Sequence, residues 1–169
     1  MAKASLCLPS HERKSTSPHS GRPEKIASDM KSLDVEMKLR FWNANYVGTH
    51  FGGSLFAMTD AFYMLMLMHH LGRDYIVWDK AATIRYKKPG RGRVRAEFRL
   101  TDAQIGDVRQ KLKTLPRYEP VFVVEVKDES GRVIAEVEKL LHVRKRADGR
   151  DELRSGGGTQ PAVLRRSQG

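Results

Sequence analysis

The pattern of hydrophobic and polar positions predicts a strand and then one long helix in the first half of the chain. Residues 35–46 alternate loosely between the two types and carry aromatic side chains, which is typical of a strand ending before Gly48. Residues 49–72 are rich in Ala, Leu and Met and end at a glycine, which favours a helix. Hydrophobic residues occupy every side of this helix, so it belongs in a protein core or a membrane. Asp60 near its middle argues against a membrane, where a carboxylate costs about 2.5 to 3.5 kcal/mol. We therefore expect a buried central helix.

The second half of the chain predicts two hairpins. Residues 75–88 and 93–101 flank a Pro-Gly turn, which indicates a hairpin. The second segment alternates charged with hydrophobic positions, so one face of the hairpin is expected to be exposed to solvent. Residues 118–127 and 132–144 flank a polar turn and predict a second hairpin.

A short amphipathic helix is expected between the two hairpins. It would begin at Asp102, which can cap it, and end at Leu115 before a proline. Its inward positions would be Ile105, Val108 and Leu112.

This order of elements predicts an α+β domain in which an antiparallel sheet of five to six strands wraps around one long central helix. One such sheet leaves part of the helix uncovered, so we expect a partner subunit, as a homodimer or a dimer of dimers. Residues 32–146 would form this domain. Residues 1–31 and 147–169 lack a hydrophobic period and are expected to be a disordered basic leader and a disordered tail.

Length and charge narrow the functional classes. The chain has 169 residues, which suits one domain, and a formal net charge of +11. Such a surplus attracts nucleic acid, acidic lipid headgroups or the phosphates of a nucleotide-bearing ligand, but no helix-turn-helix or aromatic ribonucleoprotein motif indicates a specific nucleic-acid partner. The single cysteine, Cys7, permits neither an internal disulfide nor a thiolate metal site. With no secretory signal or membrane span expected, this predicts a cytoplasmic protein without a metal.

Two features of the central helix suggest chemistry. Asp60 is a carboxylate among hydrophobic neighbours, so it is either satisfied by an Arg or a backbone amide for structural reasons or kept for function. Gly52 and Gly53 stand where the helix begins, where glycine lets a substrate oxygen approach the backbone N–H groups. They could form an oxyanion site, or serve only close packing.

Asp60 and Gly52 are eight residues apart, or roughly 12 Å along a helix axis, so one small reacting group cannot touch both in one chain. Two such helices lying antiparallel across a twofold axis would bring Asp60 of one chain to Gly52 of the other. The dimer expected from burial would thus also form the catalytic site.

Three further polar residues have both a functional and a structural interpretation. Asn45 could hold a water or the substrate carbonyl, or end the strand as a turn residue. His50 could be a general base or cap the helix, and no second residue of a triad supports the former. Asp79 could face the site or pair with Lys80.

Two groups of side chains suggest where a substrate would lie. The methionines of the helix could form an adaptable wall for an acyl chain or simply belong to the core: Met58, Met64, Met66 and Met68. A cluster of cations could hold the phosphates of a coenzyme tail or line a solvated strand face: Arg85, Lys87, Lys88, Arg91, Arg93, Arg95 and Arg99.

Together these residues resemble the hotdog-fold acyl-CoA thioesterases, in particular the phenylacetate-pathway type and the related thioesterase-like family DUF4442. The family pattern is an Asn, a Gly, a short loop with a Gly-Gly pair, and an Asp on the central helix. Here it corresponds to Asn45, Gly48, the pair at 52–53 and Asp60. The likeness extends over residues 35–146.

The sequence departs from the phenylacetate type at one place. Those enzymes usually have His directly before the Gly pair, whereas this chain has Phe51 there and His50 one place earlier. A histidine contact to the thioester is therefore not implied.

The resemblance implies roles for individual residues. Asp60 would be general base or nucleophile, the Gly52 amide would bind the carbonyl oxygen, and Asn45 would orient water or carbonyl. Substrate would be bound by a second set, namely Gly53, His50, Asp79, Arg85, Lys87 and Lys88. No cofactor is expected, because coenzyme A is part of the substrate.

The expected function is accordingly hydrolysis of acyl-CoA or another acyl thioester. A non-catalytic acyl-CoA-binding module with a regulatory role is the main alternative, and a basic nucleic-acid-binding domain is a third.

Overall fold

A computed structural model describes residues 21–146 of the chain. The first half contains two strands, a short 3-10 helix and two helices: β1 (Arg22–Ile26), β2 (Ser32–Lys38), η1 (Phe41–Asn43), α1 (Gly52–Ala57) and α2 (Phe62–Leu71). The second half contains five strands and one helix: β3 (Tyr75–Tyr86), β4 (Arg93–Arg99), α3 (Asp102–Thr114), β5 (Arg117–Tyr118), β6 (Val121–Asp128) and β7 (Val133–Lys145). The expected tail, 147–169, and the leader up to residue 20 lie outside the described residues.

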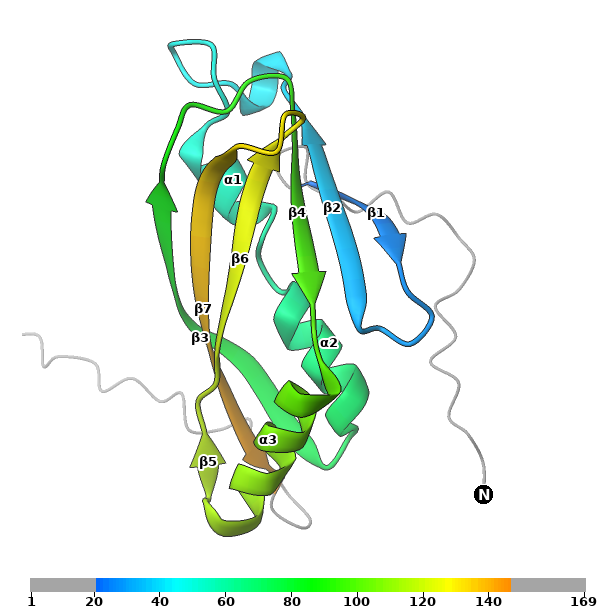
Figure 1. Cartoon of the computed structure of the whole chain (residues 1–169). Helices are drawn as coiled ribbons and strands as arrows, with labels where there is room; N and C mark the ends of the chain where they lie inside the picture. Colours follow the sequence, from blue (N-terminus) through cyan, green and yellow to red (C-terminus); the bar gives the residue numbers. More distant parts are fainter. Residues whose placement is uncertain (1–20, 147–169) are drawn as a thin grey trace, which may run out of the picture.

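The strands form one antiparallel sheet in the order β1-β2-β4-β6-β7-β3, and β5 pairs with β7. Helices α1 and α2 lie together on one face of the curved sheet, and α3 lies at the end of the sheet near β5 (Figure 1). The expected antiparallel sheet around a central helical segment is therefore present. In the described part of the chain, no helix is long and hydrophobic enough to cross a membrane.

The core lies between the sheet and the helical segment. Alternate residues of each central strand face it and are at most 4% exposed, among them Val94, Ala96, Phe98, Phe122, Val124, Val126, Val137 and Leu141. Phe98 packs its ring 5.0 Å from Phe62 and 5.2 Å from Tyr63, between centroids. Met58 and Met66 are fully buried, so these methionines belong to the core and not to an acyl-binding wall.

The prediction that residues 75–88 and 93–101 form a hairpin is wrong. β3 pairs with β7 at one end of the sheet, whereas β4 lies between β2 and β6. The alternation of residue types reports which face of a strand is buried, and it does not report the neighbouring strand. The second expected hairpin is confirmed as β6 and β7.

The first strand is displaced from its expected position. β2 covers 32–38, and the chain then turns into η1, so only the start of the expected strand 35–46 is extended. Residues 22–26, expected to belong to the disordered leader, form β1 and pair with β2. The ordered domain thus begins about ten residues earlier than its expected start at residue 32.

The expected continuous helix is also broken. α1 ends at Ala57 and α2 begins at Phe62, and Ala61 between them adopts a left-handed backbone conformation with φ of 63°. The Thr59 hydroxyl donates a hydrogen bond of 2.8 Å to the carbonyl of Phe56, and such local bonds compete with helix continuation. Asp60 sits in this break.

Helix α3 is confirmed, with Ile105, Val108 and Leu112 buried as expected. Its N-cap is Thr101 and not the expected Asp102. The Thr101 hydroxyl accepts a bond from the Gln104 N–H, and the Gln104 side chain accepts one from the Thr101 N–H.

We expect Thr101→Ala to lower the free energy of unfolding by about 1 kcal/mol, because the helix loses a capping acceptor. Urea denaturation at neutral pH measures the change. Gln104→Ala removes only the reciprocal bond and should cost less. An equal or smaller loss in Thr101→Ala than in Gln104→Ala would contradict the assigned cap.

Candidate active site

A groove of about 520 Å³ lies at the end of the sheet where the loop before α1 meets the loop between β3 and β4. It is lined by residues of both loops, of α1 and of β3: Asn45, Val47, Thr49, His50, Gly52, Leu55, Tyr86, Lys87, Lys88, Pro89, Gly90 and Arg91. Five of the expected site residues are among them, namely Asn45, His50, Gly52, Lys87 and Lys88. More than half of the nine expected site residues therefore converge at the groove.

Asn45 shapes the loop on one side of the groove. Its side-chain amide donates to the Thr49 hydroxyl at 2.8 Å, and its side-chain oxygen accepts from the N–H groups of Val47 and Thr49 at 3.1 and 3.0 Å. The Gly48 N–H closes the same turn on the Asn45 carbonyl, and Gly48 has a φ of 73°, which favours glycine. The structural interpretation of Asn45 as a turn residue is thus correct in this structure.

His50 joins the two loops of the groove. Its backbone N–H donates to the carbonyl of Gly90 at 2.9 Å, and its ring Nε2 lies 3.1 Å from the carbonyl of Gly92. The residue is only 3% exposed, and its ring Nδ1 has no hydrogen-bond partner within residues 21–146. Burial lowers the pKa of His50, and the bond to Gly92 only partly opposes this. His50 does not cap α1, whose N-cap is Phe51.

The glycine pair begins α1. A Cβ atom at Gly52 would lie 2.7 Å from the hydroxyl of Tyr86, and one at Gly53 would lie 2.4 Å from the ring of Phe51. Close packing against aromatic rings therefore requires both glycines. The N–H groups of Gly52 and Gly53 find no acceptor in the described part of the chain. Gly52 lines the groove, so its N–H can donate to a ligand there, whereas Gly53 is not among the lining residues.

A second cluster lies away from the groove and centres on Lys139 of β7. Its ammonium Nζ is 2.7 Å from Asp60 Oδ1 and 3.1 Å from Asp79 Oδ1, and its side chain is 2% exposed. It also lies 5.7 Å from the centre of the Phe56 ring. Asp60 itself is 54% exposed, so the expectation of a buried carboxylate is wrong for the single chain. The helix break carries this side chain to the surface.

Asp79 belongs to this second cluster. A bulge of β3 between Asp79 and Ala81 directs the chain so that Asp79 meets Lys139. The expected pairing with Lys80 is wrong, because Lys80 binds Glu119 at 2.7 Å. Neither Asp79 nor Asp60 lines the groove.

Lys139 was not among the expected site residues, although the sequence carries a signal for it. Positions 135, 137, 141 and 143 of β7 are hydrophobic and buried, and Lys139 occupies the same face in the middle of this series. A charged residue at an inward position of an alternating strand must be compensated by opposite charge.

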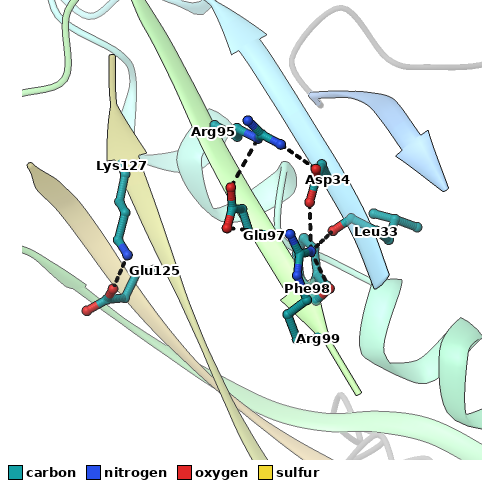
Figure 2. Close-up of polar contacts among 8 residues, drawn as sticks. All are labelled: Leu33, Asp34, Arg95, Glu97, Phe98, Arg99, Glu125 and Lys127. Atoms are coloured by element: carbon teal, nitrogen blue, oxygen red, sulfur yellow. Dashed lines mark hydrogen bonds and ion pairs between the residues drawn. The ribbon is translucent and has the colours of Figure 1, made fainter. Parts of the chain in front are cut away.

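Most of the expected phosphate-binding cations are engaged elsewhere. Arg95 and Arg99 both bind Asp34, and both also pair with Glu97 on the solvent face of the sheet (Figure 2). Burial would raise the pKa of Asp34, but the hydrogen bonds from Arg99 and Arg95 outweigh it and lower that pKa. These arginines form a charge-compensated strand face.

The remaining cations divide between the strand face and the groove. Arg93 pairs with Glu36 and Arg85 with Glu136, at 3.0 and 3.2 Å. Lys87 lies 3.9 Å from Glu136. Lys88 and Arg91 line the groove and have no ion-pair partner among residues 21–146. Within the same residues, no group of three or more His, Cys, Asp or Glu could hold a metal ion.

The pKa of His50 predicts a pH dependence of stability. Below the ordinary pKa of 6.5 the unfolded chain binds a proton at His50 while the folded protein does not, so stability is lost as the pH falls through this range. We expect the free energy of unfolding to fall more steeply from about pH 7 to about pH 5 in the wild type than in His50→Gln. Urea titrations at several pH values measure both slopes. Parallel slopes would contradict the burial of a neutral imidazole.

Comparison with known proteins gives the family and the fold. A model of the protein family "Domain of unknown function (DUF4442)" matches residues 22–143. None of the curated proteins compared with the chain matches it significantly.

Solved structures resemble the chain over about three quarters of its length. A Pseudomonas aeruginosa protein of unknown function, named a probable thioesterase, is 23% identical with a TM-score of 0.64, over 74% of this chain and 83% of that one. A thioesterase from Haemophilus influenzae is 14% identical with a TM-score of 0.55, and the match covers 73% of this chain and 77% of that one. A Chlorobaculum tepidum protein of unknown function is 13% identical with a TM-score of 0.62, and the match covers 76% of this chain and 85% of that one. At these identities the likeness shows the fold alone, and it confirms the expected hotdog fold.

Proposed function

The chain belongs to the DUF4442 family, and on this basis we propose that it is a thioesterase that hydrolyses acyl-CoA. The observation that carries the proposal is the carboxylate of Asp60, which is exposed at the helix break while the buried ammonium of Lys139 fixes it at 2.7 Å. A fixed, accessible carboxylate is suited to activating water. Proteins of the same fold that are named thioesterases support this class of reaction.

We infer that a second copy of the chain completes the site, since Asp60 and the groove are separate in one chain. Three hydrophobic residues along the helical segment are 44–54% exposed: Phe51, Leu65 and Met68. β3 ends the sheet beside them, and its outer edge has no partner among the described strands. Two copies with antiparallel helical segments would cover both features and bring Asp60 of one copy to Gly52 of the other.

In this arrangement Asp60 accepts a proton from water, and the hydroxide attacks the carbonyl carbon of the thioester. The Gly52 N–H donates a hydrogen bond to the resulting oxyanion, with the Gly53 N–H beside it. The C–S bond then breaks, and the thiolate of coenzyme A recovers the proton from Asp60. Direct attack by the Asp60 carboxylate, giving an acyl anhydride that water then cleaves, requires the same placement.

The groove cations suit the phosphates of coenzyme A. Lys88 and Arg91 are exposed at the groove and lack acidic partners in the described chain, and Lys87 is only loosely paired. Asn45 contributes by shaping its own loop, and His50 contributes by holding the two loops together. Arg85 and Asp79, with acidic and basic partners of their own, are less suited to contacting substrate directly.

A non-catalytic acyl-CoA-binding module would use the same groove. Lys88 and Arg91, which have no ion-pair partner within the described residues, favour this second function as much as the first, so the role of Asp60 distinguishes the two. Binding in such a module would not depend on the Asp60 carboxylate.

We expect Asp60→Asn to lower kcat for acyl-CoA hydrolysis by about 100-fold or more, because the variant cannot accept a proton. A thiol-release assay over short, medium and long acyl chains measures the rate. Asp74→Asn, an exposed carboxylate beyond the end of α2, is the matched control and should retain the wild-type rate. Saturable acyl-CoA binding without hydrolysis in the wild type would instead establish the binding module.

The double charge reversal Lys88→Glu and Arg91→Glu should raise KM for acyl-CoA about tenfold, which corresponds to roughly 1.4 kcal/mol of lost phosphate attraction. The KM for an acyl-N-acetylcysteamine thioester, which has no phosphate, should not change. The double reversal Lys111→Glu and Lys113→Glu on α3, at the opposite end of the sheet (Figure 1), changes the net charge equally and is the control. Equal changes for both substrates would show that the cations do not contact coenzyme A.

A further inference from the structure

The cluster around Lys139 contains more negative charge than its cation requires. The ammonium is buried on the inner face of β7, where an uncompensated charge is strongly unfavourable. One carboxylate would compensate it, yet two contact it, from the helix break and from the bulge of β3. The cluster therefore has a formal charge of −1.

The two carboxylates differ in their surroundings. Asp60 is 54% exposed and follows a turn that ends α1, whereas Asp79 is 23% exposed and lies in a strand held by β7. The Asp79 Oδ1 atom is itself buried and has no hydrogen-bond partner in the described chain, so its polar contact there is the ion pair with Lys139 at 3.1 Å. Asp79 is thus the fixed partner of Lys139, and Asp60 is the partner that a substrate or a water can reach.

We propose that Asp79 is the standing counter-ion of Lys139, which keeps the buried ammonium compensated when Asp60 loses its negative charge. This proposal rests on the proposed function for the event that neutralises Asp60, namely the uptake of a proton from the attacking water. The cluster then changes from −1 to 0 and back when the thiolate recovers the proton. With Asp79 absent, the same proton uptake would leave the buried ammonium without a counter-ion. Lys139 and Asp79 are therefore positioning residues.

The proposal is testable without any substrate, because Asp60→Asn mimics the neutral form of Asp60. In chains that retain Lys139, Asp60→Asn and Asp79→Asn together should raise the unfolding equilibrium constant at least roughly tenfold more than the product of their separate fold-changes predicts. In the background of Lys139→Met this excess should disappear. The pair Asp60→Asn and Asp74→Asn is the control and should be additive. Additivity of the Asp60 and Asp79 substitutions in the presence of Lys139 would overturn the proposal.

A kinetic measurement distinguishes a role in proton transfer from a purely structural role. Asp79→Asn should lower kcat about tenfold with little change in KM, and the addition of Lys139→Met should restore part of the rate, because the cluster regains a charge of −1. Lys139→Arg should stay close to the wild type. If Asp79→Asn and Lys139→Met impair the rate independently, the role in proton transfer is refuted. If the wild type hydrolyses no acyl thioester, the proposed function fails, and the unfolding measurements still decide whether Asp79 is the counter-ion.

Discussion

The constraint on which the structure depends is that one curved sheet can cover only one side of a helical segment that is hydrophobic all round. Met58, Met66 and Leu67 on the covered side are fully buried, whereas Leu65 and Met68 remain about half exposed. Among residues 21–146, the uncovered side lies beside a strand edge without a partner. We therefore infer that a second copy of the chain covers this side, and the proposed reaction needs the same copy because Asp60 and the groove at Gly52 are separate in one chain.

Within the chain, one buried cation brings together the two carboxylates of the proposed chemistry. Lys139 stands among hydrophobic residues of β7 and must be met by carboxylates. The break between α1 and α2 delivers Asp60 to it, and the bulge of β3 delivers Asp79. Both irregularities interrupt otherwise regular elements, and the carboxylate at each of them contacts the same ammonium group. The departures from regular structure thus coincide with the candidate site.

The sequence predicted what depends on local periodicity. The short helix α3, the hairpin of β6 and β7 and the loop motif around Gly52 lie where expected, and the family resemblance is confirmed. Pairing of β3 was missed because alternation identifies a buried face and not a neighbouring strand. The helix break was missed because the Ala, Leu and Met content favours helix over the segment as a whole. Locally, the Thr59 hydroxyl bonds the Phe56 carbonyl and Ala61 is left-handed. Lys139 is recognisable in the sequence as a charge at an inward strand position, but this signal was not used to predict a site residue.

The central claim is that each site combines the carboxylate of one subunit with the groove of another, and subunit complementation tests it most directly. Asp60→Asn removes the carboxylate, and Gly52→Val fills the space against Tyr86, so each variant alone should be inactive. A refolded equimolar mixture should regain about a quarter of the wild-type rate, since half of the randomly formed dimers carry one intact site. A mixture as inactive as its parents, with mixed dimers demonstrated by mass spectrometry, would show that no site is shared between subunits.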